Sequence, residues 1–130
     1  MRLALAACAV LTMAASPAPA AAAGCRESPR VVGPCFTMRG RLFVANGAPT
    51  FRIRPANSRR LLGVFDGAYN ADTAEVLPPA VRTIATPPGP GELYPVDGAW
   101  RLCPLAQQRA GRMQPVCIDG AWRLKALRPG

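Results

Sequence analysis

Histidine is absent from this sequence of 130 residues, and acidic and aromatic residues are scarce. Without an imidazole, the chain has no Ser-His or Cys-His nucleophile pair and no zinc site built on histidine. Beyond residue 23 the only serines are Ser28 and Ser58, and neither lies in a G-x-S-x-G motif. We therefore expect a protein that is not an enzyme and that uses no cofactor.

Paired carboxylates are the one catalytic pattern that the composition leaves open. Asp66, Asp97 and Asp119 each precede Gly-Ala. A pair of carboxylates can catalyse glycoside hydrolysis. The same Asp-Gly pairs are typical of tight turns, because both residue types tolerate a positive φ. Turn geometry is the interpretation that we favour.

The first 23 residues have the pattern of a secretory signal peptide. A basic start at Met1-Arg2 precedes an apolar run, and alanines with A-x-A spacing lead up to Gly24. The run is shorter than the roughly 20 residues that span a bilayer. We expect residues 1–23 to be a signal peptide and 24–130 to be a single exported β domain, either periplasmic or secreted. The small pair before Cys25 leaves a lipoprotein as the alternative, and membrane attachment is expected only if Cys25 carries lipid.

Four cysteines follow the expected signal peptide: Cys25, Cys35, Cys103 and Cys117. An even number in a small exported domain indicates two disulfides. Three pairings are open, and we favour Cys25 with Cys35 and Cys103 with Cys117, because both pairs close short loops. The spacing lacks the paired C-x2-C motif of a four-thiolate zinc site, so no metal is expected.

Alternating apolar and polar residues predict strands over 36–44, 50–54 and 60–65. Asn46-Gly47 is a strong signal for a two-residue hairpin turn between the first two. Such a turn places Leu42 opposite Phe51, Gly40 opposite Ile53, Arg41 opposite Arg52 and Arg39 opposite Arg54. One side of the hairpin is then apolar and the other is the arginine face, which consists of Arg39, Arg41, Arg52 and Arg54.

The sequence after residue 67 predicts a long connection followed by two more strands. Residues 68–95 are rich in proline, and Pro79 favours a short helix over 80–85. Strands are expected over 100–105 and 113–118. The segment Asp97-Gly98-Ala99-Trp100 recurs as Asp119-Gly120-Ala121-Trp122, and we expect both tryptophans to pack in the core or across strands. The alternative is that these indoles are exposed and bind carbohydrate.

Short segments spread from Cys35 to Ile118 follow one another at a specific spacing. They are Cys35-Phe36-Thr37, Gly40-Arg41-Leu42, Asn46-Gly47 with Pro49, Arg52-Ile53, Arg60 with Leu62-Gly63-Val64, Leu77-Pro78 with Val81, Leu102-Cys103-Pro104-Leu105 and Gly111-x-Met113-Gln114-x-Val116-Cys117-Ile118. With these segments the chain resembles a family of small exported bacterial proteins to which no function is assigned. The resemblance implies export and a Cys103–Cys117 disulfide, and it brings no catalytic residues. This chain departs from the family in its many arginines and in the Asp-Gly-Ala-Trp copy at 119–122.

Three strands, a helix-bearing connection and two further strands are also the order found in OB-type barrels. A two-sheet sandwich fits the same strands. We therefore expect an all-β fold: a small five-stranded antiparallel barrel, OB-like, or a sandwich, with at most one short helix and two disulfide staples.

Seven arginines and no acid lie between Ser28 and Phe65. Like charges opposite each other on a sheet are destabilising by up to about 1 kcal/mol per pair, so acids from elsewhere or a bound anion should offset them. Our leading hypothesis is a non-catalytic binding module whose arginine face contacts anionic envelope ligands. Nucleic acid is disfavoured, because Phe43 is the only aromatic residue on that face. The alternative is an envelope structural or inhibitory protein whose 68–95 connection contacts a partner protein.

Overall fold

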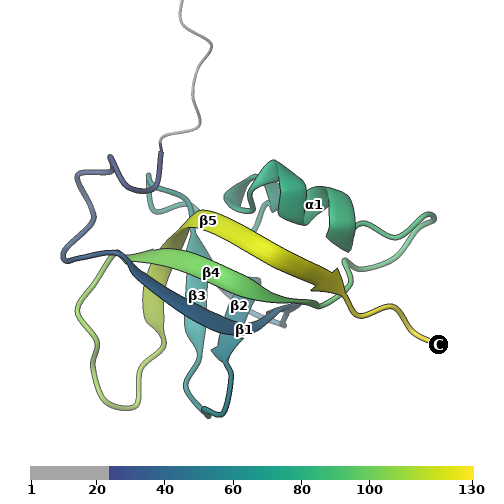
Figure 1. Cartoon of the computed structure of the whole chain (residues 1–130). Helices are drawn as coiled ribbons and strands as arrows, with labels where there is room; N and C mark the ends of the chain where they lie inside the picture. Colours follow the sequence, from purple (N-terminus) through teal and green to yellow (C-terminus); the bar gives the residue numbers. More distant parts are fainter. Residues whose placement is uncertain (1–23) are drawn as a thin grey trace, which may run out of the picture.

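A computed structural model describes residues 24–130, and the expected signal peptide at 1–23 lies outside the described residues. Residues 24–130 form five strands: β1 (Phe36–Val44), β2 (Phe51–Pro55), β3 (Leu62–Phe65), β4 (Val96–Pro104) and β5 (Gln114–Ala126). A 3-10 turn, η1 (Ala74–Val76), and one helix, α1 (Pro79–Ala85), lie between β3 and β4 (Figure 1). The predicted strands are all present, and the last two are longer than expected.

The strands close into a barrel in the order β1-β2-β3-β5-β4, with β4 returning to β1. The all-β, OB-like expectation is confirmed, and the sandwich alternative is wrong. The expectation of a wholly antiparallel barrel is also wrong, because β3 and β5 pair in parallel. A closed ring with an odd number of strands cannot make every neighbouring pair antiparallel, so one parallel contact is required.

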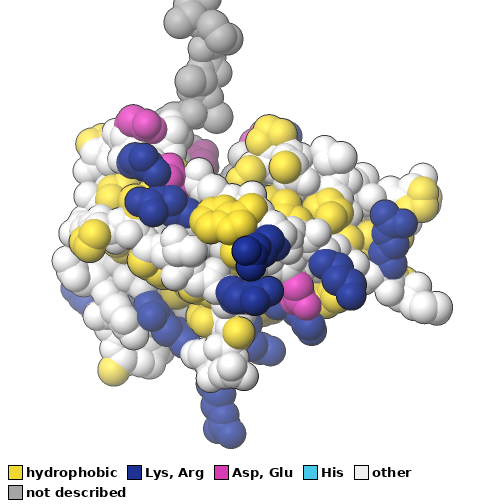
Figure 2. Space-filling view, in the orientation of Figure 1, with side chains coloured by type: hydrophobic (Ala, Val, Ile, Leu, Met, Phe, Trp, Pro, Cys, Tyr) yellow, Lys and Arg dark blue, Asp and Glu magenta, His cyan; other side chains and the backbone are white. Residues whose placement is uncertain are grey.

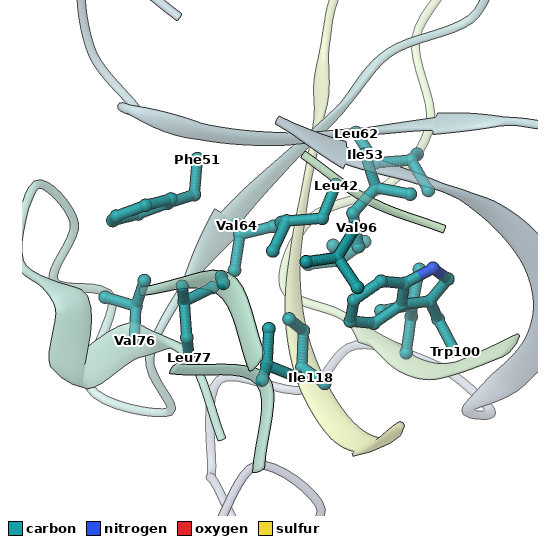
Figure 3. Packing of buried hydrophobic residues seen from close by; sticks show 14 residues of the cluster. Leu42, Phe51, Ile53, Leu62, Val64, Val76, Leu77, Val96, Trp100 and Ile118 are labelled. Atoms are coloured by element: carbon teal, nitrogen blue, oxygen red, sulfur yellow. The ribbon is translucent and has the colours of Figure 1, made fainter. Parts of the chain in front are cut away.

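Apolar side chains from all five strands fill the barrel (Figure 3). Trp100 is fully buried, and its indole N–H donates a 2.9 Å hydrogen bond to the carbonyl oxygen of Gly40. A Cβ on Gly40 would lie 2.5 Å from the carbonyl oxygen of Arg54. Gly40 therefore lets β1 and β2 approach closely over the central indole.

The hairpin between β1 and β2 differs from the predicted two-residue turn. Residues 45–50 form the loop, closed by a 2.8 Å hydrogen bond from Ala45 N–H to the carbonyl oxygen of Thr50. The observed register pairs Leu42 with Ile53 and Arg41 with Arg54, two residues away from the prediction. The predicted register would have put Pro49 in the ladder, where it has no N–H to donate. A shift of two residues preserves the alternation, so the arginines stay on the outer side.

The connection after β3 is ordered, and part of it belongs to the core. Pro79 is the first residue of α1, as predicted, where its missing N–H is not needed. Leu77, Val81 and Ala85 are buried against the barrel, and α1 lies beside β5 (Figure 1). Across residues 24–130, no helix has the length and apolar character needed to cross a membrane.

The repeated Asp-Gly-Ala-Trp segment takes opposite orientations in β4 and β5. Arg101 pairs with Gly120 while the next residue, Leu102, pairs with Ile118, so Asp119 is an extra residue on β5. This bulge shifts the alternation by one position. Trp100 therefore points into the barrel, whereas Trp122 lies opposite Ala99 on the outside and is 42% exposed.

Two disulfides fasten the segment before β1 to the outer wall of the barrel. They join Cys25 to Cys117 and Cys35 to Cys103, so the favoured pairing, and with it the Cys103–Cys117 bridge implied by the family resemblance, is wrong. Cys103 and Cys117 are partners across β4 and β5, but each bonds to the segment that covers them. In the chain-entropy picture, cross-links over 92 and 68 residues restrict the unfolded chain more than the short loops would.

The disulfide-bonded cysteines form a small cluster of buried side chains separate from the barrel core, and this limits the chemistry of their sulfur atoms. The Sγ atoms of Cys25, Cys103 and Cys117 lie within 4.8 Å of one another. All three are in disulfides and offer no thiolate to a metal ion. A lipid thioether at Cys25 and the Cys25–Cys117 disulfide exclude each other, because both use the same sulfur.

Peptide mapping tests this connectivity directly. Trypsin sites at Arg26, Arg30, Arg109 and Arg112 place the four cysteines on separate peptides. Mass spectrometry of a non-reduced digest should find peptide 31–39 joined to 102–109, and the Cys25 peptide joined to 113–123. A linked pair of 102–109 with 113–123 would contradict the structure.

Candidate functional site

A basic groove of about 690 Å³ lies on the outer wall of the barrel. The wall is built from the middle of β1, the end of β2 and the loop after it, the start of β4 and the end of β5. The charged residues that line the groove are five cations and one acid: Arg39, Arg41, Arg54, Arg123, Lys125 and Asp97. Figure 2 shows Lys and Arg side chains spread over the side of the molecule formed by β1, β4 and β5, with few acidic side chains among them. We call this site the basic groove.

Strand register produces a row of charges across the groove. Arg54 of β2 is opposite Arg41 of β1, which is opposite Asp97 of β4, which in turn is opposite Lys125 of β5. Neighbouring strands are about 4.8 Å apart, so the row extends over about 14 Å. Three cations and one carboxylate therefore share one line on the barrel surface.

Asp97 is the acid that partly neutralises this row. Its carboxylate accepts hydrogen bonds from Nε of Arg41 at 2.7 Å and from Nη2 at 3.1 Å. These bonds are the main reason that the pKa of Asp97 lies below its usual value, and they raise the pKa of Arg41. Both side chains remain exposed, at 54% for Arg41 and 42% for Asp97. Arg41 is thus paired but still accessible to a ligand.

The other three residues of the arginine face have different surroundings. Among residues 24–130, Arg39 and Arg54 form no ion pair, and the guanidinium of Arg54 lies 5.4 Å from the centre of the Phe43 ring. Arg52 donates hydrogen bonds to the carbonyl oxygens of Pro49 and Asn46 in the hairpin loop. The structure therefore brings Arg39, Arg41 and Arg54 together in the basic groove and leaves Arg52 outside it.

Arg123 and Lys125 complete the groove, and sequence reasoning did not find them. Between the pairs Ala99–Trp122 and Asp97–Lys125, β5 contains one residue more than β4. Arg123 takes a φ of 54° at this second bulge, a conformation that residues with a side chain rarely adopt. Strict alternation over a straight strand would not have placed Trp122 and Arg123 both on the exposed side.

Three of the six other acids form contacts away from the groove. Asp119 accepts a hydrogen bond of 2.8 Å from Arg26 and lies 3.3 Å from Arg101, which ties the segment before β1 to the barrel. Asp66 accepts hydrogen bonds from the backbone of its own turn, and Asp72 accepts them from Thr50. Of the four arginines on the predicted face, only Arg41 has a carboxylate partner within the described part of the chain.

Comparison with protein-family models, with curated proteins and with solved structures finds no match to this chain. The resemblance to small exported bacterial proteins therefore stays a prediction. What the structure shows is the coarser statement, a five-stranded closed barrel of OB-like architecture with two disulfides.

The ion pair of Arg41 and Asp97 makes stability depend on pH. Because the pKa of Asp97 is lowered on folding, its contribution is complete well above the usual value of 3.8 and is lost as the pH falls below it. Chemical denaturation should show Asp97→Asn to be less stable than wild type at pH 7 by up to about 1 kcal/mol, as expected for an exposed pair. The difference should vanish in acid. The matched control, Glu92→Gln, removes an exposed carboxylate outside the groove, and a pH-independent difference for Asp97→Asn would contradict the assignment.

Proposed function

We propose that this protein is a non-catalytic binding module that holds anionic ligands of the cell envelope in its basic groove. The supporting observation is the excess of five cations over one acid within a single concave site. Guanidinium groups donate paired hydrogen bonds to carboxylate and phosphate groups, so this composition suits either anion. The proposal retains the expectation of an exported protein, periplasmic or secreted.

The charge arrangement supports binding rather than a purely structural role for these arginines. Repulsion between Arg41 and Arg54, which are opposite each other across β1 and β2, is only partly offset by Asp97. An anion in the groove would supply the missing negative charge. Arg39 and Arg54 are exposed and have no carboxylate partner among residues 24–130, so both can bind it without breaking an existing ion pair.

The alternative, a structural or inhibitory protein that contacts a partner through residues 68–95, has less support. Val76, Leu77, Val81 and Ala85 of this connection are buried in the barrel core. Their side chains stabilise the fold and are not available to a partner. The exposed remainder of the connection has no concentration of charge comparable to that of the basic groove.

Binding to inorganic polyphosphate tests the proposal, because this probe presents anionic charge without a ring or an apolar part. Arg39→Gln/Arg54→Gln should weaken binding about tenfold or more in isothermal titration calorimetry, since each charge-assisted hydrogen bond is worth roughly 1.5 to 3 kcal/mol. The control, Arg109→Gln/Arg112→Gln, removes the same charge from an exposed loop outside the groove.

Asp97→Asn should have the opposite effect on the affinity for polyphosphate. Removing this carboxylate releases Arg41 and should tighten polyphosphate binding several-fold. Equal losses in the two double variants would show that only net charge matters, and a wild-type protein that does not bind would end the proposal.

A further inference from the structure

Trp122 is an exposed indole beside the basic groove. Among residues 24–130 the exposed large hydrophobic side chains are Val32, Tyr69 and Trp122. Tyr69 stacks on Phe65 with ring centres 4.6 Å apart and has the guanidinium of Arg30 5.6 Å from its ring. Within the same described residues, no ring or guanidinium is stacked on Trp122, whose six-membered ring lies beside Gly120. Figure 2 shows apolar surface among the basic side chains of this wall. An accessible aromatic ring within a polar surface is typical of a contact site.

Strand pairing places the backbone of Trp122 in line with a groove cation, although Trp122 itself does not line the groove. Trp122 lies opposite Ala99 of β4, and Ala99 lies opposite Arg39 of β1. Two strand spacings separate the backbones of Trp122 and Arg39, about 10 Å. Ala99 between them is small and only 6% exposed, so the larger side chains around it close over it.

The backbone is specifically shaped to expose this ring. The bulge at Asp119 turns Trp122 outward, although the same four-residue segment in β4 turns Trp100 inward. The second bulge lies immediately after Trp122 and directs Arg123 into the groove. Two adjacent irregularities in β5 thus place an indole and a guanidinium on the same surface, as bulges at binding sites often do.

We infer that the ligand of the basic groove is an acidic polysaccharide, which stacks a sugar ring on Trp122 while its carboxylate groups bind Arg39 and the other groove cations. The inference rests on the proposed function and specifies its ligand. The C–H groups on one face of a pyranose ring form an apolar surface that matches an indole, and Asn57 and Ser58 in the groove wall supply polar groups for hydroxyls.

The spacing of the charges favours a polymer over a single small anion. The cations of the row are distributed over about 14 Å rather than directed at one point. A chain that carries one carboxylate per sugar can contact several of them at once. Single-stranded nucleic acid needs several stacking surfaces, and the second aromatic residue of the site, Phe43, has the Arg54 guanidinium over its ring.

The test compares three probes: oligogalacturonate, inorganic polyphosphate and oligothymidylate of matched charge. Trp122→Ala should weaken oligogalacturonate binding about tenfold while polyphosphate binding changes less than twofold. Trp122→Phe, which keeps a flat ring, should retain most of the affinity. The near-ultraviolet circular dichroism of buried Trp100 verifies that each variant is folded.

Acrylamide quenching gives an independent readout, because Trp100 is fully buried and Trp122 is 42% exposed. Oligogalacturonate should protect the quenchable fluorescence, and polyphosphate should not. Polyphosphate binding without oligogalacturonate binding, or an unchanged Trp122→Ala affinity, would overturn this inference and leave the proposed function standing. Tighter, Trp122-dependent binding of oligothymidylate would overturn it in favour of nucleic acid. Failure to bind polyphosphate would overturn both, because this inference rests on the proposed function.

Discussion

Closure of the barrel by β5 is the constraint on which the rest of the structure depends. This strand pairs in parallel with β3 and antiparallel with β4, and a five-stranded ring cannot close without one parallel contact. Its 13 residues extend beyond the contact with β3, so its C-terminal half pairs with β4 alone. The two bulges in β5 adapt the long strand to β4 and determine which of its side chains face outward.

The two halves of β5 have different roles. In the first half, Val116 and Ile118 fill the core, while Cys117 on the other side anchors the segment before β1. In the second half, Trp122, Arg123 and Lys125 are exposed, and the two cations face the arginines of β1 and β2 across the basic groove. A single acid, Asp97, neutralises part of this charge. One part of the barrel is therefore covered by the segment that the disulfides hold in place, and another part is an accessible, cationic wall.

Much of the fold follows from local patterns in the sequence. Alternation located β1 and β2, Pro79 located the helix, and the strand order indicated the OB-like barrel. The hairpin register was missed because Asn46-Gly47 is a strong turn signal, whereas the exclusion of Pro49 from the ladder decides the loop. The disulfide pairing was missed because loop length says nothing about which surface the segment before β1 covers.

The candidate site was only half predictable for a similar reason. Arg39, Arg41 and Arg54 alternate along regular strands, so their shared face could be inferred from the sequence. Arg123 and Lys125 join them only because of a bulge that depends on the register between β4 and β5. Identical Asp-Gly-Ala-Trp segments gave no signal that one tryptophan would be buried and the other exposed.

The most direct test of the central claim, that the basic groove is the ligand site, is a nuclear magnetic resonance titration. Amide shifts of the 15N-labelled protein would be followed as inorganic polyphosphate is added. We expect the largest changes to cluster at residues 39–41, 54–58, 97–98, 123 and 125, which line the groove. Changes centred on the 106–112 loop, or spread evenly over all arginines, would contradict it.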